Sequence, residues 1–121
     1  ARLEAGSAAA RQLRAEVFRS VRTAIAIGVP IVFGSDAPGL PHGENAREFG
    51  ALIQAGLTPE RALRSATLDA ARMLGEGRKS GRVAAGYRAD LIAVEGDPLH
   101  DWKTLTRVRF VMKEGVVISR P

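Results

Sequence analysis

The sequence predicts an α/β fold in which a helical part containing one buried strand is followed by a small antiparallel sheet. Two observations lead to this prediction. Residues 8–75 show helical periodicity that is interrupted by one short apolar run, at residues 29–34. Beyond residue 76 this periodicity disappears and short β-type runs replace it. We therefore expect two parts, residues 1–75 and residues 76–121, and the second begins with the polar, glycine-bearing stretch 76–81.

The first elements are a long helix and a strand. Apolar residues recur at three- and four-residue steps through residues 8–27, and Gly28 stands where a helix C-terminal glycine is common. The run 29–34 is apolar throughout and ends in turn residues, which is typical of a strand buried on both faces of a parallel sheet. The backbone groups of this strand need a hydrogen-bonded neighbour, but the helical part contains no second predicted strand. Either several copies associate, or the chain is the C-terminal part of a larger barrel.

Two further helices are expected before residue 76. Asn45 is predicted as an N-cap, with Glu48 three residues later completing a capping-box-like pair. Thr58 supplies a second capping hydroxyl, followed by a proline at the first helical position. The apolar spacing after Thr58 predicts one continuous helix that ends at Gly75.

The remaining sequence predicts four short strands. These are residues 82–84, 90–94, 107–112 and 116–119, and the last two are joined by a tight hairpin at residues 113–115. Four short strands do not make a robust isolated sheet, so we expect partner strands elsewhere.

Composition excludes several classes of function. The formal charge is +5, but the arginines of residues 11–22 form the polar face of an amphipathic helix and the others are scattered without interleaved aromatics, so we expect no nucleic-acid partner. No apolar run approaches the roughly 20 residues that span a bilayer, and no secretory signal is visible, which predicts no membrane association and a cytoplasmic location. The absence of cysteine excludes thiolate metal sites. Since the sequence starts without Met, we expect an upstream segment that was removed or left out.

Asp36 is the candidate site residue, because it follows the carboxyl end of the predicted buried strand, where α/β folds build their sites. His42 lies on the glycine- and proline-rich loop beyond it and is a candidate pocket residue. Each has a simpler alternative. Asp36 could be a loop aspartate that accepts backbone hydrogen bonds, and His42 a loop histidine with local partners.

Four ordered motifs resemble the amidohydrolase superfamily. They are G-S-D-A at residues 34–37, H-G-E-N-A-R-E at 42–48, A-G-L-T-P-E-R-A-L-R-S-A-T-L-D-A-A-R-M-L-G at 55–75, and G-R-V-A-A-G-Y-R-A-D-L-I-A-V-E-G-D-P-L at 81–99. The second motif is most similar to the branch that contains imidazolonepropionase-related hydrolases and Xaa-Pro dipeptidases. The resemblance implies the C-terminal portion of a (β/α)8 TIM-type barrel, with its last strand and helices, followed by part of a small antiparallel β-sandwich.

The resemblance also implies roles for individual residues. Asp36 matches the aspartate that contacts the metal and transfers protons to and from the activated water. His42 matches a loop that lines the substrate pocket, and Asp90 matches a recurrent turn residue. The implied cofactor is a divalent metal, zinc above all, and the implied reaction is hydrolysis of a C–N bond in an amide, peptide or cyclic amide, with a small molecule or dipeptide as substrate.

The sequence departs from the family pattern in its metal ligands. The family also uses an H-x-H pair, a carboxylated lysine or glutamate, and two further histidines, whereas His42 and His100 are the two histidines of this sequence. One carboxylate and one histidine cannot hold a hydrolytic zinc, so we expect this chain alone to bind no metal and to be inactive. The alternatives to an enzyme portion are a self-associating, non-enzymatic remnant without metal and, third, a basic binding module.

Overall fold

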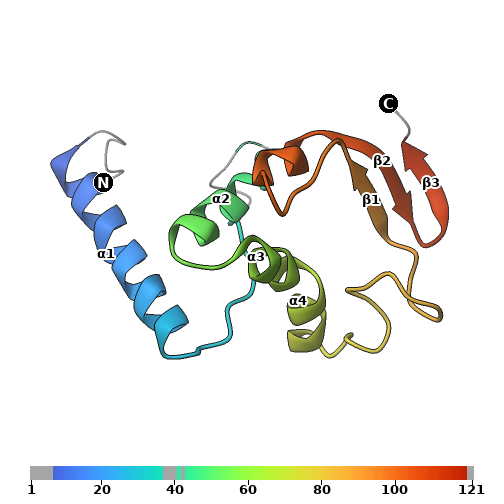
Figure 1. Ribbon diagram of the computed structural model, residues 1–121, viewed down its shortest axis with the longest axis horizontal. Coiled ribbons are helices and arrows are strands. Elements are labelled where there is room, and N and C mark those ends of the chain that lie inside the picture. Colours follow the sequence, from blue (N-terminus) through green and yellow to red (C-terminus); the bar gives the residue numbers. More distant parts are fainter. Residues whose placement is uncertain (1–6, 37–40, 42, 120–121) are drawn as a thin grey trace. The chain divides into compact units, whose positions relative to one another are not determined.

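The computed structural model describes residues 7–36, 41 and 43–119. The chain forms two compact units, Ala1–Ile31 and Val32–Pro121. Figure 1 shows their elements in sequence colours. Among the described helices, none combines the length and apolar character needed to cross a membrane. The division at residues 75 and 76 that the sequence suggests stays a prediction.

The first unit contains helix α1, Ala8–Ala26, which confirms the expected long helix. It begins at Ser7, whose side chain accepts a hydrogen bond from the Ala10 N–H at 3.1 Å. It ends where Gly28, at φ 80°, turns the chain out of the helix. None of its residues is buried within the described structure.

The predicted strand at residues 29–34 does not form, and this expectation was wrong. Residues 29–36 belong to no helix or strand. The physical reason is the one that the sequence already indicated: a strand exists only beside a neighbour that satisfies its backbone groups. The one sheet among the described residues has the order β1-β2-β3 and includes none of this segment.

The second unit opens with three helices, α2 (Arg47–Gln54), α3 (Pro59–Ala66) and α4 (Leu68–Met73). Thr58 caps α3 as predicted, accepting from the Arg61 N–H at 3.2 Å. The predicted cap of α2 is wrong, because Ala46 occupies the N-cap position and no side chain caps this helix.

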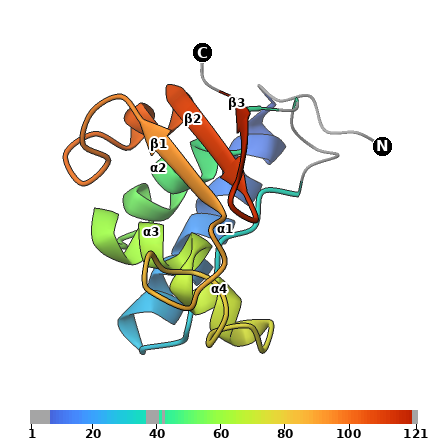
Figure 2. The same cartoon turned by 90° about the vertical axis from the view of Figure 1, so that its right-hand side faces the viewer.

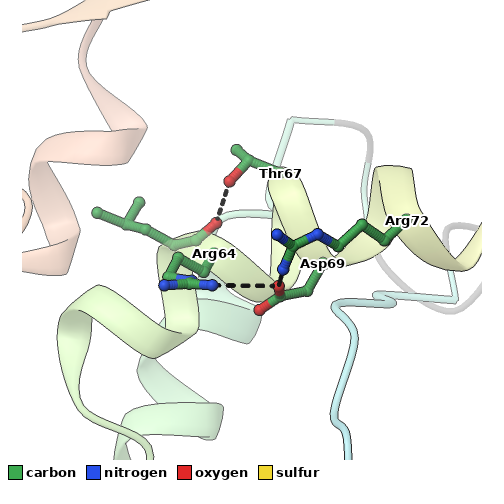
Figure 3. A network of polar contacts seen from close by, with 5 residues as sticks. Arg64, Thr67, Asp69 and Arg72 are labelled. Atoms are coloured by element: carbon green, nitrogen blue, oxygen red, sulfur yellow. Dashed lines mark hydrogen bonds and ion pairs between the residues drawn. The ribbon is translucent and has the colours of Figure 1, made fainter. Parts of the chain in front are cut away.

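The expected continuous helix from residue 58 to residue 75 is broken at Thr67. Its backbone leaves the helical region, at φ −124° and ψ −95°, while its hydroxyl donates to the Leu63 carbonyl at 2.9 Å. Asp69 lies across the break and pairs with Arg64 at 3.6 Å and Arg72 at 3.5 Å (Figure 3).

Gly81 explains why the chain can pass so close to this break. Its φ is +87°, and a Cβ there would lie 2.8 Å from the Thr67 carbonyl oxygen and 2.9 Å from the Leu68 Cα. A side chain would therefore collide with backbone that has little room to move.

The sheet confirms three of the four predicted strands. Strands β1 (Leu91–Val94), β2 (Val108–Lys113) and β3 (Val116–Ser119) form an antiparallel sheet with β2 in the middle (Figure 2). The hairpin at residues 113–115 forms as expected, with Gly115 at φ 80°. Residues 82–84 form no strand, so that expectation was wrong. Asp90 is not itself in a turn but directly precedes β1, and its carboxylate accepts from the Glu114 N–H and the Lys113 ammonium of the β2–β3 hairpin at 2.7 and 2.6 Å.

The core of the second unit is small and lies around α2 and α3. A short 3-10 helix, η2 (Trp102–Thr106), packs against α2 and β1. Among the described residues of the unit, the buried apolar ones are Leu52, Ala55, Leu57, Ala62 and Ala71. Ser65 is 1% exposed and satisfies its hydroxyl by donating to the Ala62 carbonyl at 2.7 Å.

Candidate functional site

Asp36 lies at the end of an irregular segment of the second unit, residues 32–36, which we call the site segment. Its side chain is exposed, and its backbone has a φ of 46°, in the left-handed region. This conformation costs a residue with a Cβ about 1 kcal/mol, although aspartate tolerates it better than most. Such a conformation persists only where the surrounding contacts fix it. Those contacts come from α3, from α2 and from the chain that leads into α2.

Phe33 joins the site segment to two helices. Its N–H donates to the carbonyl of the buried Ser65, on α3, at 3.0 Å. Its ring packs against that of Phe49, on α2, with centroids 4.5 Å apart and planes tilted by 37°. Contacts between aromatic rings of this kind contribute about 0.5–1.5 kcal/mol beyond the area they bury. Phe33 therefore fixes the segment three residues before Asp36.

Ser35 provides a second attachment, directly beside Asp36. Its hydroxyl oxygen accepts a hydrogen bond from the Asn45 side-chain amide at 2.7 Å, and both residues are half-buried. Asn45 is therefore not the cap that the sequence predicts, but a partner of the site segment. Sequence reasoning missed this contact. The signal for it in the sequence is the position of Asn45 inside the H-G-E-N-A-R-E motif, where a helix cap also explains an asparagine.

Helix α2 also packs against the 3-10 helix η2. Trp102, on η2, packs so closely against Gly50 that a Cβ at Gly50 would lie 2.6 Å from two of its ring carbons. On the same helix, partial burial raises the pKa of the Glu48 carboxyl above its ordinary value. In the sequence, Phe49 is therefore flanked by Gly50, which makes the tight contact with Trp102, and by Glu48, whose carboxyl is partly desolvated.

The described residues do not form a complete metal centre. No group of three or more histidine, cysteine, aspartate or glutamate side chains within residues 7–36, 41 and 43–119 could hold a metal ion. A catalytic zinc takes three protein ligands and keeps a position open, and Asp36 alone offers one carboxylate. His42, the other predicted site residue, lies outside the described residues.

Comparison with known proteins identifies the family. The profile described as "Amidohydrolase family" matches residues 5–118. Ochratoxinase of Aspergillus niger is 36% identical over 108 residues, which is 85% of this chain and 22% of that protein. Imidazolonepropionase of Thermoplasma volcanium is 33% identical over 84 residues, or 68% of this chain and 21% of that protein.

A solved structure extends the match to three dimensions. The crystal structure of a Xaa-Pro dipeptidase with bound methionine in the active site superposes with a TM-score of 0.84 at 36% identity, covering 87% of this chain and 26% of that one. The chain belongs to the amidohydrolase family, as its motifs indicated. Its helices and three-stranded antiparallel sheet agree with a partial domain of that family, and it spans about a fifth to a quarter of the length of these relatives.

Proposed function

We propose that this chain is the C-terminal part of a metal-dependent amidohydrolase, and that it supplies the carboxylate that moves protons during hydrolysis of a C–N bond. The observation that carries the proposal is Asp36, an exposed carboxylate on a left-handed backbone, held by the contacts of Phe33 and Ser35 inside a family match that covers residues 5–118. In this proposal the site segment corresponds to the end of the last barrel strand, and residues 76–121 to part of a β-sandwich.

Asp36 would act as general base and then as general acid. Its carboxylate accepts a proton from the attacking water and returns it to the nitrogen of the leaving group, which would otherwise depart as an unstable anion. Its short side chain, placed at the end of an anchored segment, keeps the carboxylate oriented for both transfers. We assign His42 to the substrate pocket, as the family motif implies.

A divalent metal, with zinc as the first choice, would supply Lewis-acid activation of water and of the scissile carbonyl when bound. Asp36 would be one of its ligands. The described residues do not complete the set, so the other donors would lie outside them. We expect a small amide or a dipeptide as substrate, because one relative is a Xaa-Pro dipeptidase with methionine in its active site.

The test compares two aspartates in the whole protein that carries this chain. Asp36→Asn keeps the shape of the side chain but removes its basicity, and should lower kcat by about 10²- to 10⁴-fold, the usual contribution of a positioned acid or base. Asp69→Asn is the matched control, because the Asp69 carboxylate pairs with Arg64 and Arg72 on the helix surface. This variant should leave kcat unchanged. Assays would use dipeptides and cyclic amides, with metal content measured in each variant. Wild-type turnover by a metal-loaded Asp36→Asn variant would refute the catalytic role.

One observation favours the second candidate, a self-associating chain without enzymatic activity. Large apolar side chains of the sheet are exposed, Ile92 at 57% and Ile118 at 62%. Surfaces of this kind occur where further protein packs. Light scattering and metal analysis of the isolated chain separate the two: an oligomer without metal favours self-association, and a monomer that binds one metal tightly contradicts it.

A further inference from the structure

Asn45 is joined to the site segment by one hydrogen bond. Its side-chain amide nitrogen lies 2.7 Å from the hydroxyl oxygen of Ser35, across a separation of ten residues. An amide nitrogen can only donate, so Ser35 accepts. The contact is half-buried, where competition from water is reduced and a hydrogen bond is stronger than on the open surface.

From this contact we propose that Asn45 is a positioning residue for Asp36, acting through Ser35. The inference rests on the proposed function, because it concerns how the proton-transferring carboxylate of that function is oriented. Asn45 touches no reacting group in this proposal. Its role is to restrict the peptide that precedes Asp36.

The backbone of Asp36 explains why such a restriction is needed. At φ 46° it lies in a small allowed region, and for a residue with a Cβ the extended and right-handed regions are lower in energy. A rotation of φ into either region would swing the carboxylate to another side of the chain. The residues around Asp36 must therefore supply the restraint.

The other described attachment of the site segment is too far along the chain to do this alone. Phe33 is held by the Ser65 carbonyl and by the Phe49 ring, but two residues, with their own free dihedral angles, separate it from Asp36. Ser35 is the immediate neighbour of Asp36, and the hydrogen bond to its hydroxyl restricts the residue directly before the carboxylate. Asn45 therefore acts closer to Asp36 along the chain than the Phe33 contacts do.

The first experiment measures steady-state kinetics of the whole protein. Asn45→Ala and Ser35→Ala should each lower kcat by about 10- to 100-fold, the loss that follows a small misplacement of a catalytic group, with KM changed by less than about twofold. The double variant should be no slower than either single variant, because both substitutions remove the same hydrogen bond. Ser35→Thr keeps the hydroxyl and should retain most of the activity. Gln12→Ala removes an exposed amide on α1 and should leave kcat unchanged.

Two further experiments distinguish a positioning role of Asn45 from other causes of lost activity. In an Asp36→Asn background, Asn45→Ala should cause no additional loss, since the group that it positions is absent. Hydrogen exchange followed by mass spectrometry should show faster exchange in peptides that cover residues 32–36 of Asn45→Ala, with unchanged exchange in residues 108–119.

Each failure has a distinct meaning. Additive losses in the double variant, a loss that persists in the Asp36→Asn background, or unchanged exchange in residues 32–36 would overturn the positioning role. Unchanged kcat in Asn45→Ala, with Asp36→Asn inactive, would do the same while leaving the proposed function intact. Full activity of Asp36→Asn would instead refute the proposed function, and the exchange experiment would still decide whether Asn45 orders the site segment.

Discussion

Substitution of Gly50 by alanine sets two opposing effects against each other in helix α2. Alanine is favoured over glycine in a helix interior by about 1 kcal/mol, so an unobstructed site would be stabilised. At Gly50, however, the new Cβ would lie 2.6 Å from Cε2 and Cζ2 of Trp102 and 3.0 Å from its Nε1. Carbon atoms in contact are normally about 3.5–4.0 Å apart, so the ring must move by about 1 Å.

The clash should outweigh the gain in helix propensity. Overpacking of a well-filled contact costs about 1–3 kcal/mol, which leaves a net destabilisation of about 0–2 kcal/mol for Gly50→Ala. Trp102→Leu removes all three close atoms, because a leucine side chain ends at its Cδ atoms. In that background the same Gly50→Ala change should stabilise α2, by up to about 1 kcal/mol. The predicted result is therefore a change of sign between the two backgrounds.

Native-state hydrogen exchange of the α2 amides measures the relevant opening free energy directly. In each background the Gly50→Ala variant is compared with the protein that retains Gly50, so that the cost of Trp102→Leu itself cancels. A stabilisation of about 1 kcal/mol by Gly50→Ala in the presence of Trp102 would show that the ring does not constrain this helix. The packing argument would then be refuted.

Two predictions concern pH. Burial raises the pKa of Glu48, so the folded state favours its protonated form and loses stability as pH rises from the unfolded value of about 4.3 through the folded one. Glu48→Gln should thus be more stable relative to the wild type at pH 7 than at pH 4 in urea unfolding, and a pH-independent difference would contradict this. The hydrogen bond from Lys113, aided by the Glu114 N–H, holds the pKa of Asp90 below its usual range. Its stabilisation is therefore present above about pH 3.9 and is lost as pH falls through the folded value. Asp90→Asn should accelerate hydrogen exchange in the hairpin at pH 7, and equal acceleration at about pH 2.5, after correction for intrinsic rates, would refute the assignment.

Features set by nearby residues could be predicted from the sequence. Helix α1 follows from its apolar spacing and from Gly28, and the structure places its end one residue before the predicted one. The hairpin between β2 and β3 follows from alternation and from Gly115. In both cases the signal and the structure lie within a few residues of each other, so no distant contact can override it.

Features set by distant residues could not be predicted. The apolar spacing of residues 59–74 runs without interruption through Thr67, because the side-chain hydrogen bond that accompanies the break leaves no trace in the hydrophobic pattern. The run 29–34 has the composition of a strand, but composition does not supply a neighbouring strand. In the candidate site, the motif makes Asp36 a candidate, and that assignment stays a prediction. The contact of Asn45 with Ser35 could not be predicted, because an asparagine before a helix can cap that helix or donate to a distant residue.

The orientation of Asp36 depends on residues that are coupled through α2. Phe49 is on this helix, and Asn45 lies two residues before it begins, so a displacement of α2 would move the Phe33 contact and the Ser35 contact together. The position of α2 in turn depends on Trp102, a residue of η2 far along the chain, which fits only because residue 50 has no side chain. A change at Gly50 can therefore reach the carboxylate without touching it. This coupling makes the geometry of the site a property of the packed helices, and explains why a motif around Asp36 alone does not define it.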